Sequence, residues 1–354
     1  MVLRARIVAV NVLPAILIAC LACLSAYAQP RSGSTSLDAA SIRSRFLKII
    51  DRPRVPLDPK LRSGGASQGL TATHFTFATD ADERVPGIII RPEKAAGRRP
   101  AVIVLHGTGD SKEGMLDWAS ELAVRGFLAV AIDGRYHGER IKTSYDDAIL
   151  RAYKTGKEHP FLYDTVWDVM RLIDYLETRD DVDAKRIGLI GISKGGMETY
   201  LASAADPRIA VAVPCISVQS FRWALENNAW QARVGTIQSA VEGAAHSDRA
   251  TLNAQFVRTF YDRLVPGIYS EFDGPAMLPL IAPRPLMVIN GDSDSLTPLP
   301  GVLLAANSAS EAYTKAGAKE KFVLRVQKNT GHSVNGDSLR AAIDWFVFWL
   351  KPSS

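Results

Sequence analysis

The hydrophobic pattern of this chain alternates between two kinds of segment. Short apolar runs rich in β-branched residues occur at residues 100–105, 127–132, 187–192, 209–215, 285–290 and 321–327. Such runs predict strands buried on both faces of a sheet. Helix-compatible segments lie at residues 115–125, 161–179, 197–205, 302–316 and 339–350. This alternation predicts an α/β protein with a mostly parallel central sheet that helices cover on both faces.

Three other regions depart from the alternation. Residues 71–79 and 85–91 are strand candidates separated by a polar turn, which predicts a hairpin. Residues 29–70 are polar, and we expect an N-terminal arm with one amphipathic piece there. Between residues 216 and 282 the periodicity weakens and aromatic residues accumulate, which indicates a helical cap insertion. We therefore expect one domain over residues 71–354, interrupted by this cap.

Residues 1–28 have the pattern of a secretory signal. Two early arginines precede an apolar stretch, and Ala26-Tyr27-Ala28 forms an A-x-A cleavage site. A membrane anchor is one alternative, although Pro14 interrupts the apolar stretch. Lipidation of Cys20 is another, because the preceding residues resemble a lipobox. We expect cleavage after Ala28 and a periplasmic or secreted protein without stable membrane insertion.

Cysteine content and charge narrow the class of protein further. Cleavage after residue 28 would leave Cys215 as the only cysteine, so no disulfide could form within the mature chain. A large exported chain without disulfides is typical of a bacterial periplasm. The full chain has 354 residues, is 47% hydrophobic and carries a formal charge of +5. This charge is too small to indicate binding to nucleic acid or to an anionic membrane.

The segment 186–196 joins a predicted strand to a predicted helix through the spacing G-x-S-x-G around Ser193. A serine on such a turn is exposed above the sheet, and the flanking glycines leave room for the backbone. The helix N-terminus directs its free N–H groups toward the atom that the serine attacks. A turn that serves only packing is the alternative. The position between strand and helix favours Ser193 as a nucleophile.

A serine nucleophile needs an imidazole to accept its proton. His332 lies after Ser193, in a glycine-containing loop between the last strand and the last helix, and is the predicted base among six histidines. The loop 291–298 supplies the carboxylate that would orient the imidazole. Asp294 is the predicted partner of His332. Asp292 is the alternative, although an aspartate so close to the strand end can instead make a turn within its own loop.

Small residues at 106–109 predict an oxyanion hole, in which the N–H groups of Thr108 and Lys194 would hold the developing charge. His106 precedes this turn and is expected to be structural. We expect His137 and Tyr136, in the loop after strand 127–132, to border the substrate pocket without transferring protons.

Trp223, in the predicted cap, is a further candidate for substrate binding. The aromatic residues of the cap could stack on sugar rings or enclose an acyl chain, and packing within the cap is the alternative.

The order Ser193, Asp294, His332 resembles that of the α/β-hydrolase fold over residues 85–350. More narrowly, the spacing of aspartates upstream of the segment 186–196 resembles the dienelactone hydrolase and acetyl xylan esterase branch. This resemblance implies ester hydrolysis through an acyl-enzyme, with no metal and no organic cofactor. Dienelactone hydrolases have cysteine in place of the serine, and acetyl xylan esterases commonly have glutamine in place of the lysine that follows it.

The leading interpretation is a serine esterase that acts on a small-molecule or carbohydrate ester. One alternative is a serine peptidase that resembles the prolyl oligopeptidase catalytic domain, but the region before Val85 is too short for the propeller of that family. The other is a hydrolase-like binding protein without catalysis, although such relatives typically lack one of the three catalytic residues. The pattern does not indicate the acid or alcohol portion of the substrate, or the oligomeric state.

Overall fold

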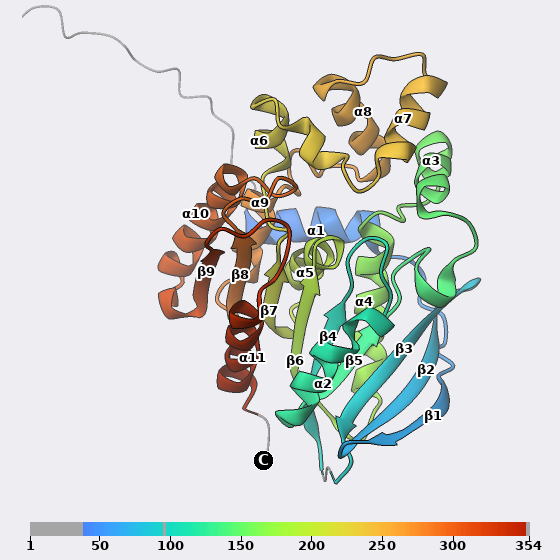
Figure 1. Ribbon diagram of the computed structural model, residues 1–354, viewed down its shortest axis with the longest axis vertical. Coiled ribbons are helices and arrows are strands. Elements are labelled where there is room, and N and C mark those ends of the chain that lie inside the picture. The colour runs from blue at the N-terminus through green and yellow to red at the C-terminus, as the bar shows by residue number, and fades with distance from the viewer. Residues whose placement is uncertain (1–37, 95–96, 352–354) are drawn as a thin grey trace, which may run out of the picture. The chain divides into compact units, whose positions relative to one another are not determined.

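The computed structural model describes residues 38–94 and 97–351 (Figure 1). The predicted signal peptide, its cleavage site and Cys20 lie outside the described residues. In the part of the chain that is described, no helix combines the length and the apolar character needed to cross a bilayer. The same residues contain no group of three or more His, Cys, Asp or Glu side chains placed to hold a metal ion.

Within these residues, nine strands form one sheet in the order β1-β2-β3-β5-β4-β6-β7-β8-β9. Their bounds are β1 Lys60–Ser67, β2 Leu70–Asp80, β3 Glu83–Pro92, β4 Arg99–Leu105, β5 Leu128–Ile132, β6 Val182–Ile192, β7 Ile209–Cys215, β8 Leu286–Gly291 and β9 Phe322–Gln327. The strands from β5 across to β9 pair in parallel, whereas β1, β2 and β3 pair antiparallel with their neighbours. The predicted mostly parallel sheet is confirmed, as is the hairpin of β2 and β3.

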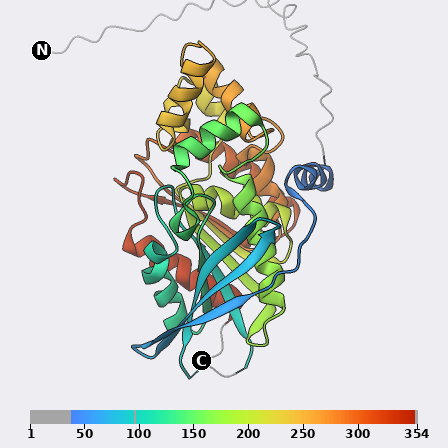
Figure 2. The ribbon, with the colours of Figure 1, turned by 90° about the vertical axis from the view of Figure 1, so that its right-hand side faces the viewer.

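Helices cover both faces of the sheet. One face carries α1 (Ala39–Ile50), α4 (Tyr163–Glu177), α5 (Lys194–Ala205) and α10 (Leu299–Lys315), and the other carries α2 (Leu116–Val124) and α11 (Gly336–Leu350). Figure 2 shows the two layers, with α2 and α11 on one side of the strands and α1 on the other. Because strands such as β4 are buried on both faces, their sequences are continuously apolar rather than alternating.

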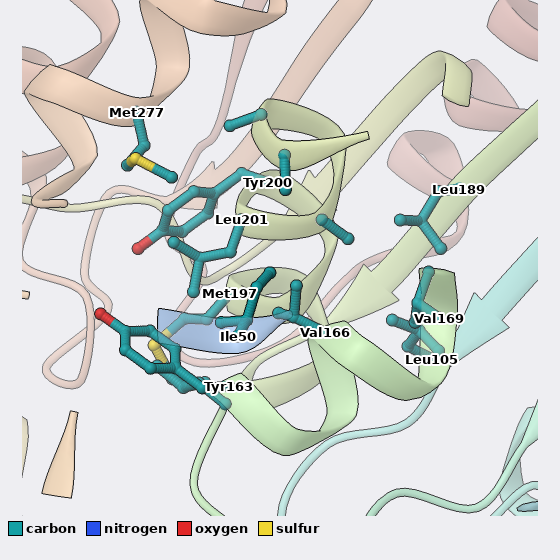
Figure 3. Packing of buried hydrophobic residues seen from close by; sticks show 14 of the residues in the cluster. Ile50, Leu105, Tyr163, Val166, Val169, Leu189, Met197, Tyr200, Leu201 and Met277 are labelled. Carbon is teal, nitrogen blue, oxygen red and sulfur yellow. The ribbon is translucent and has the colours of Figure 1, made fainter. Parts of the chain in front are cut away.

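The helix α5, which follows Ser193, is buried along its whole length. Its side chains Met197, Tyr200 and Leu201 pack among apolar residues of α4 and α1, including Val166 and Ile50 (Figure 3). Each fully buried side chain of this size contributes about 1.5–3 kcal/mol relative to exposure. This packing fixes the axis of α5, and therefore the direction in which its N-terminus points.

Two elements were not predicted. The strand β1 falls inside the expected N-terminal arm, so the boundary drawn at residue 70 separates β1 from the sheet to which it belongs. All eight of its residues are exposed, and its sequence lacks the apolar alternation that predicts a strand. Its position depends on backbone pairing with β2. The helix α3 (Tyr145–Thr155) was also missed, although Ser144 caps its start and Gly156 its end.

The region 216–282 consists of short helices, as expected. They are α6 (Phe221–Glu226), the 3-10 turn η3 (Trp230–Arg233), α7 (Gln238–Ser247), α8 (Ala254–Leu264), α9 (Gly274–Met277) and the 3-10 turn η4 (Leu278–Ile281). The helix α3 packs against α7 and α8 and extends this cap (Figure 1). The ring of Tyr261 makes edge contacts with Phe161, Phe221 and Tyr269. These rings pack against one another, as the alternative role considered for the cap aromatics requires.

Candidate active site

Ser193 lies on a sharp turn between β6 and α5. Its backbone has φ 54° and ψ −117°, a region that L-residues rarely occupy. A backbone in such a region costs about 1–3 kcal/mol, which the surrounding packing must offset. The N–H of Ser193 donates to the carbonyl of Cys215 on β7 at 3.0 Å. The turn holds the serine side chain at the carboxyl edge of the parallel strands.

Two glycines of the G-x-S-x-G spacing are required by close backbone approach. A Cβ at Gly191 would lie 2.2 Å from the carbonyl oxygen of Gly195. A Cβ at Gly195 would lie 2.5 Å from the carbonyl oxygens of both Leu105 and His106. Real Cβ atoms do not come so near to backbone oxygens. The turn itself therefore requires glycine at Gly191, and the loop after β4 can approach the turn only if Gly195 is glycine.

Gly195→Ala is therefore expected to displace the loop after β4 and to lower the free energy of unfolding by at least about 2 kcal/mol. The control is Gly336→Ala at the start of α11, where a Cβ would meet only the Nη1 of Arg340, at 3.5 Å. Denaturant unfolding of both variants measures the difference. Equal stabilities of the two variants would contradict the steric argument.

The structure brings Ser193, His332 and Asp294 together in one chain of hydrogen bonds. Nε2 of His332 lies 2.8 Å from the Oγ of Ser193. Nδ1 of His332 lies 2.8 Å from Oδ2 and 3.0 Å from Oδ1 of Asp294. A carboxylate can only accept, so Nδ1 carries the proton and Nε2 is free to accept one from the serine hydroxyl. The arrangement can remove the proton of Ser193 as its oxygen attacks a carbonyl carbon.

Asp294 is held in place by its own loop. The N–H groups of Leu296 and Thr297 donate to Oδ1 at 2.9 and 3.0 Å, and the hydroxyl of Thr297 donates to Oδ2. Burial alone would raise the pKa of Asp294, but the hydrogen bonds from His332 and Thr297 outweigh burial and hold the pKa below its ordinary value. Asp294 is thus ionised at neutral pH, as a partner of an imidazole must be.

Asp292 has a different role. Its carboxylate accepts from the N–H groups of Asn329 at 3.0 Å and Thr330 at 3.2 Å. These groups belong to the loop that carries His332, so Asp292 ties that loop to the end of β8. The expectation that Asp292 would bond backbone N–H groups of its own loop is wrong in this respect, because the loops after β8 and β9 lie side by side.

The predicted oxyanion loop lies against the nucleophile. A Cβ at Gly107 would be 3.4 Å from the Cβ of Ser193. Within the described chain, no protein acceptor is recorded for the backbone N–H of Thr108 or of Lys194, which opens α5. Both donors are next to the serine in sequence or in space. They are therefore available for an oxyanion, and the start of α5 adds the positive end of a helix dipole.

His106 links this loop to the loop after β5. Its Nδ1 lies 2.7 Å from the carbonyl oxygen of Gly107, and its Nε2 accepts from the N–H of Gly134 at 2.9 Å. Burial, with the nearby charge of Lys194, lowers the pKa of His106 to about 2. A neutral imidazole that bridges two backbone groups fits the structural role predicted for it.

The Lys194 side chain does not line the cavity beside Ser193. It is buried, and its Nζ donates to the Oε1 of Glu198 at 2.8 Å, one turn along α5. Burial raises the pKa of Glu198, and the ammonium group of Lys194 opposes that rise. The backbone and the side chain of Lys194 therefore lie in different surroundings.

The structure does not place the three predicted substrate residues beside Ser193. His137 is buried, with Nδ1 2.7 Å from the carbonyl oxygen of Arg135, and burial lowers its pKa to about 3. His137 and Tyr136 line a separate cavity, together with Gly109. Trp223 belongs to α6 and packs toward Gly301 at the start of α10.

A narrow cavity contains Ser193 and His332. Its other walls come from α5, the loop after β7, the cap and the acid loop. The lining residues besides Ser193 and His332 are Phe161, Met197, Ile216, Ser217, Gln219, Ala232, Arg233, Thr236, Tyr261, Leu296 and Thr297. Of these eleven, only Tyr261 belongs to the cap aromatics considered for substrate contact, and none was named individually, because no local motif distinguishes them from packing residues.

Ser193 stands on a strand–turn–helix of a parallel sheet, and an imidazole and a buried carboxylate from two later loops form a hydrogen-bond chain with it. This arrangement defines a serine hydrolase of the α/β-hydrolase fold. A family described as glucuronyl esterase of fungi matches residues 81–317. The chain belongs to this family and is a carboxylic ester hydrolase. This assignment confirms the predicted fold, enzyme class and resemblance to α/β-hydrolase esterases. The family assignment supports neither the peptidase alternative nor the binding-protein alternative.

Two further relatives are similar to this chain in sequence. YtaP of Bacillus subtilis, named as a candidate hydrolase, is 26% identical over 281 residues, which are 76% of this chain and 84% of that protein. The 4-O-methyl-glucuronoyl methylesterase 1 of Sodiomyces alcalophilus is 30% identical over 204 residues, or 55% of this chain and 39% of that protein.

The crystal structure of acetyl xylan esterase 1 from Thermoanaerobacterium has a TM-score of 0.66 and 19% identity, covering 90% of this chain and 94% of that one. A glucuronoyl esterase from Solibacter usitatus has a TM-score of 0.59 and 18% identity, covering 89% of this chain and 95% of that one. At these identities the similarity shows the fold.

Proposed function

We propose that this protein hydrolyses an ester of a carbohydrate through an acyl-enzyme formed on Ser193. The observation that carries the proposal is the hydrogen-bond chain from Ser193 through His332 to Asp294. Each of its two links measures 2.8 Å, which is the reach required for proton transfer. The proposed reaction needs no metal and no organic cofactor.

In the first half of the reaction, the Oγ of Ser193 attacks the ester carbonyl carbon while Nε2 of His332 takes the hydroxyl proton. The carbonyl oxygen becomes an oxyanion, which the N–H groups of Thr108 and Lys194 stabilise. When this intermediate collapses, the bond to the leaving alcohol breaks and His332 returns the proton to the alcohol oxygen. An acyl group remains on Ser193.

In the second half, water takes the place of the alcohol. His332 removes a proton from the water as its oxygen attacks the acyl carbon, and then protonates the Oγ of Ser193 as the acid leaves. Asp294 stabilises the imidazolium that forms in each half. Three hydrogen bonds from its own loop fix the buried carboxylate of Asp294. The fixed carboxylate in turn keeps His332 in one orientation.

The substrate class rests on the comparisons. Family membership points to glucuronyl esters, and the structural neighbours include both glucuronoyl and acetyl xylan esterases. These activities share a carboxylic ester attached to a sugar, whether the sugar supplies the acid or the alcohol. We therefore propose a carbohydrate ester as the substrate. The activity assays below identify its acid and alcohol portions.

Purified protein should be tested on a methyl ester of glucuronic acid, acetylated xylo-oligosaccharides, an aryl acetate without sugar, and an aminoacyl anilide. We expect kcat/KM for at least one sugar ester to exceed that for the aryl acetate. Hydrolysis of the aryl acetate alone would leave an esterase but overturn the carbohydrate assignment. Faster hydrolysis of the anilide would favour the peptidase alternative.

We also propose that the protein is exported after cleavage behind Ala28. The proposal rests on the sequence pattern of residues 1–28, with its A-x-A site. Intact mass and N-terminal sequencing of protein from the natural host would test it. A start at Gln29 without lipid is the expected result, whereas a diacylated Cys20 terminus or an uncleaved chain would contradict it.

A further inference from the structure

The wall of the active-site cavity contains a buried arginine that forms no ion pair with the residues described. Arg233, at the end of η3, is only 5% exposed. Among the residues described, no carboxylate oxygen lies within 4.0 Å of its guanidinium nitrogens. Burial lowers its pKa. Three arginines buried to a similar degree, Arg135, Arg140 and Arg171, each pair with an aspartate.

Most hydrogen-bond donors of Arg233 are unused. A guanidinium has five N–H donors in a fixed planar arrangement. One acceptor is recorded for them, the carbonyl oxygen of Leu296, which takes a hydrogen bond from Nη2. Nε is buried and has no partner within the described structure, as is also true of Arg140 and Arg171, but those two arginines form ion pairs through their other nitrogens. The Phe221 ring lies 5.0 Å from the guanidinium carbon and supplies a weak attraction that no ion pair reinforces.

The same cavity wall has two further unsatisfied polar atoms. The Oγ of Ser217 and the Oε1 of Gln219 are buried, and neither has a recorded partner in residues 38–94 and 97–351. Buried polar atoms are almost always hydrogen-bonded, so three such atoms around one cavity call for a ligand or ordered water. The Nε of Arg233 and the hydroxyl of Ser217 can both donate to a negatively charged group, whereas the Oε1 of Gln219 can only accept and needs a donor such as a hydroxyl or water.

We propose that Arg233 is a specificity-determining residue that binds a carboxylate of the substrate. A planar guanidinium matches a carboxylate with two parallel hydrogen bonds, and burial strengthens them. The inference rests on the proposed function, because Arg233 shares its cavity with Ser193 and His332. It narrows the substrate to an ester that also bears a free carboxylate near the scissile carbonyl.

This carboxylate could belong to either portion of the ester. On the acid side, the substrate would be a half-ester of a dicarboxylic acid. On the alcohol side, it would be a uronic acid with an acylated hydroxyl. Both kinds of substrate place a carboxylate in the cavity. The test therefore needs one matched pair of charged and neutral substrates for the acid side and one for the alcohol side.

A purely structural role for Arg233 must be separated from binding. Leu296, whose carbonyl accepts from Arg233, donates its N–H to Asp294. Loss of Arg233 could therefore disturb the acid loop and slow all substrates alike. A binding role instead acts on charged substrates and appears mainly in KM.

The first pair is 4-nitrophenyl hemiglutarate and 4-nitrophenyl pentanoate, and the second is an acetylated glucuronic acid and the equally acetylated glucose. We expect the wild type to prefer the anionic member of one pair, and the pair identifies the source of the carboxylate. Arg233→Gln should reduce that preference about 10- to 100-fold, the usual effect of losing a hydrogen bond to a charged group. Arg233→Lys should retain part of the preference, because it keeps the charge.

Arg258→Gln is the matched control, because Arg258 is a cap arginine on α8 whose side chain is 64% exposed. It removes the same charge away from the cavity and should leave the preference unchanged. Glutarate should also inhibit the wild type competitively, and its neutral diamide should not, which tests binding even if Arg233→Gln fails to fold.

Loss of anionic and neutral activity in equal proportion in Arg233→Gln would overturn the proposal in favour of a positioning role. So would a wild type without preference in either pair, or without competitive inhibition by glutarate. If sugar esters are hydrolysed and no preference is found, this inference alone fails. If no sugar ester is hydrolysed, the proposed function fails independently.

Discussion

Ser193→Ala is expected to lower kcat on an aryl ester by about 10⁶-fold, the loss seen when a serine hydrolase of this type loses its nucleophile. The alanine keeps the Cβ and the strained backbone of the turn, and removes only the oxygen that would attack. The melting temperature should therefore stay close to that of the wild type. Steady-state kinetics and a melting curve on the same preparation measure both quantities.

Covalent labelling tests the same assignment without a substrate. A fluorophosphonate should attach to Ser193, because His332 lies 2.8 Å from its Oγ. Ser217→Ala is the control, since Ser217 lines the same cavity but its Oγ has no hydrogen-bond partner among the residues described. That variant should still be labelled at Ser193. A label on Ser217, or a rate near the wild type in Ser193→Ala, would show that the nucleophile is misassigned.

Most of the sheet could be predicted because its strands are buried on both faces. Strands such as β4 and β5 are then almost continuously apolar, and this local signal needs no knowledge of the partners. The strand β1 gave no such signal, because it lies at the sheet edge with every residue exposed. Tertiary pairing with β2, rather than composition, makes it a strand.

Site residues were predictable where a short sequence motif sets both the side chain and the backbone conformation around it. Ser193 is marked by the glycines that its turn requires, and His332 by its loop after β9. The substrate residues were not predictable in this way. His137 follows a strand end, as a pocket residue would, yet its ring is turned into the protein by the carbonyl of Arg135. Arg233 lies in a cap whose sequence carries no motif at all.

The choice between Asp292 and Asp294 shows where sequence reasoning ends. Both residues follow β8 in one short loop, and both are aspartates with hydrogen bonds to backbone N–H groups. Which of them reaches the imidazole depends on how the loops after β8 and β9 are aligned. That alignment is a tertiary property, and the structure places Asp294 against Nδ1 of His332.

Asp294→Asn is expected to lower kcat by roughly 10²–10⁴-fold, because an amide can hold the imidazole in the wrong tautomer and cannot stabilise its cation. The amide nitrogen would donate to Nδ1 of His332, which would then place the proton on Nε2 and block acceptance from Ser193. KM should change little. The comparison is Asp292→Asn, since Asp292 lies two residues earlier and bonds the backbone of Asn329 and Thr330 instead.

Asp292→Asn should keep kcat within about tenfold of the wild type, because the amide oxygen can still accept from one of those two N–H groups. The pKa of Asp292 is held below its ordinary value chiefly by the N–H of Asn329, so the stabilising contact of its carboxylate weakens only as the pH falls through that lowered pKa. The measurement is kcat for both variants on one aryl ester, with melting curves alongside. An inactive Asp292→Asn beside an active Asp294→Asn would reverse the assignment. Proton transfer would then depend on the carboxylate of Asp292, which joins the two loops, and not on that of Asp294, which contacts the imidazole.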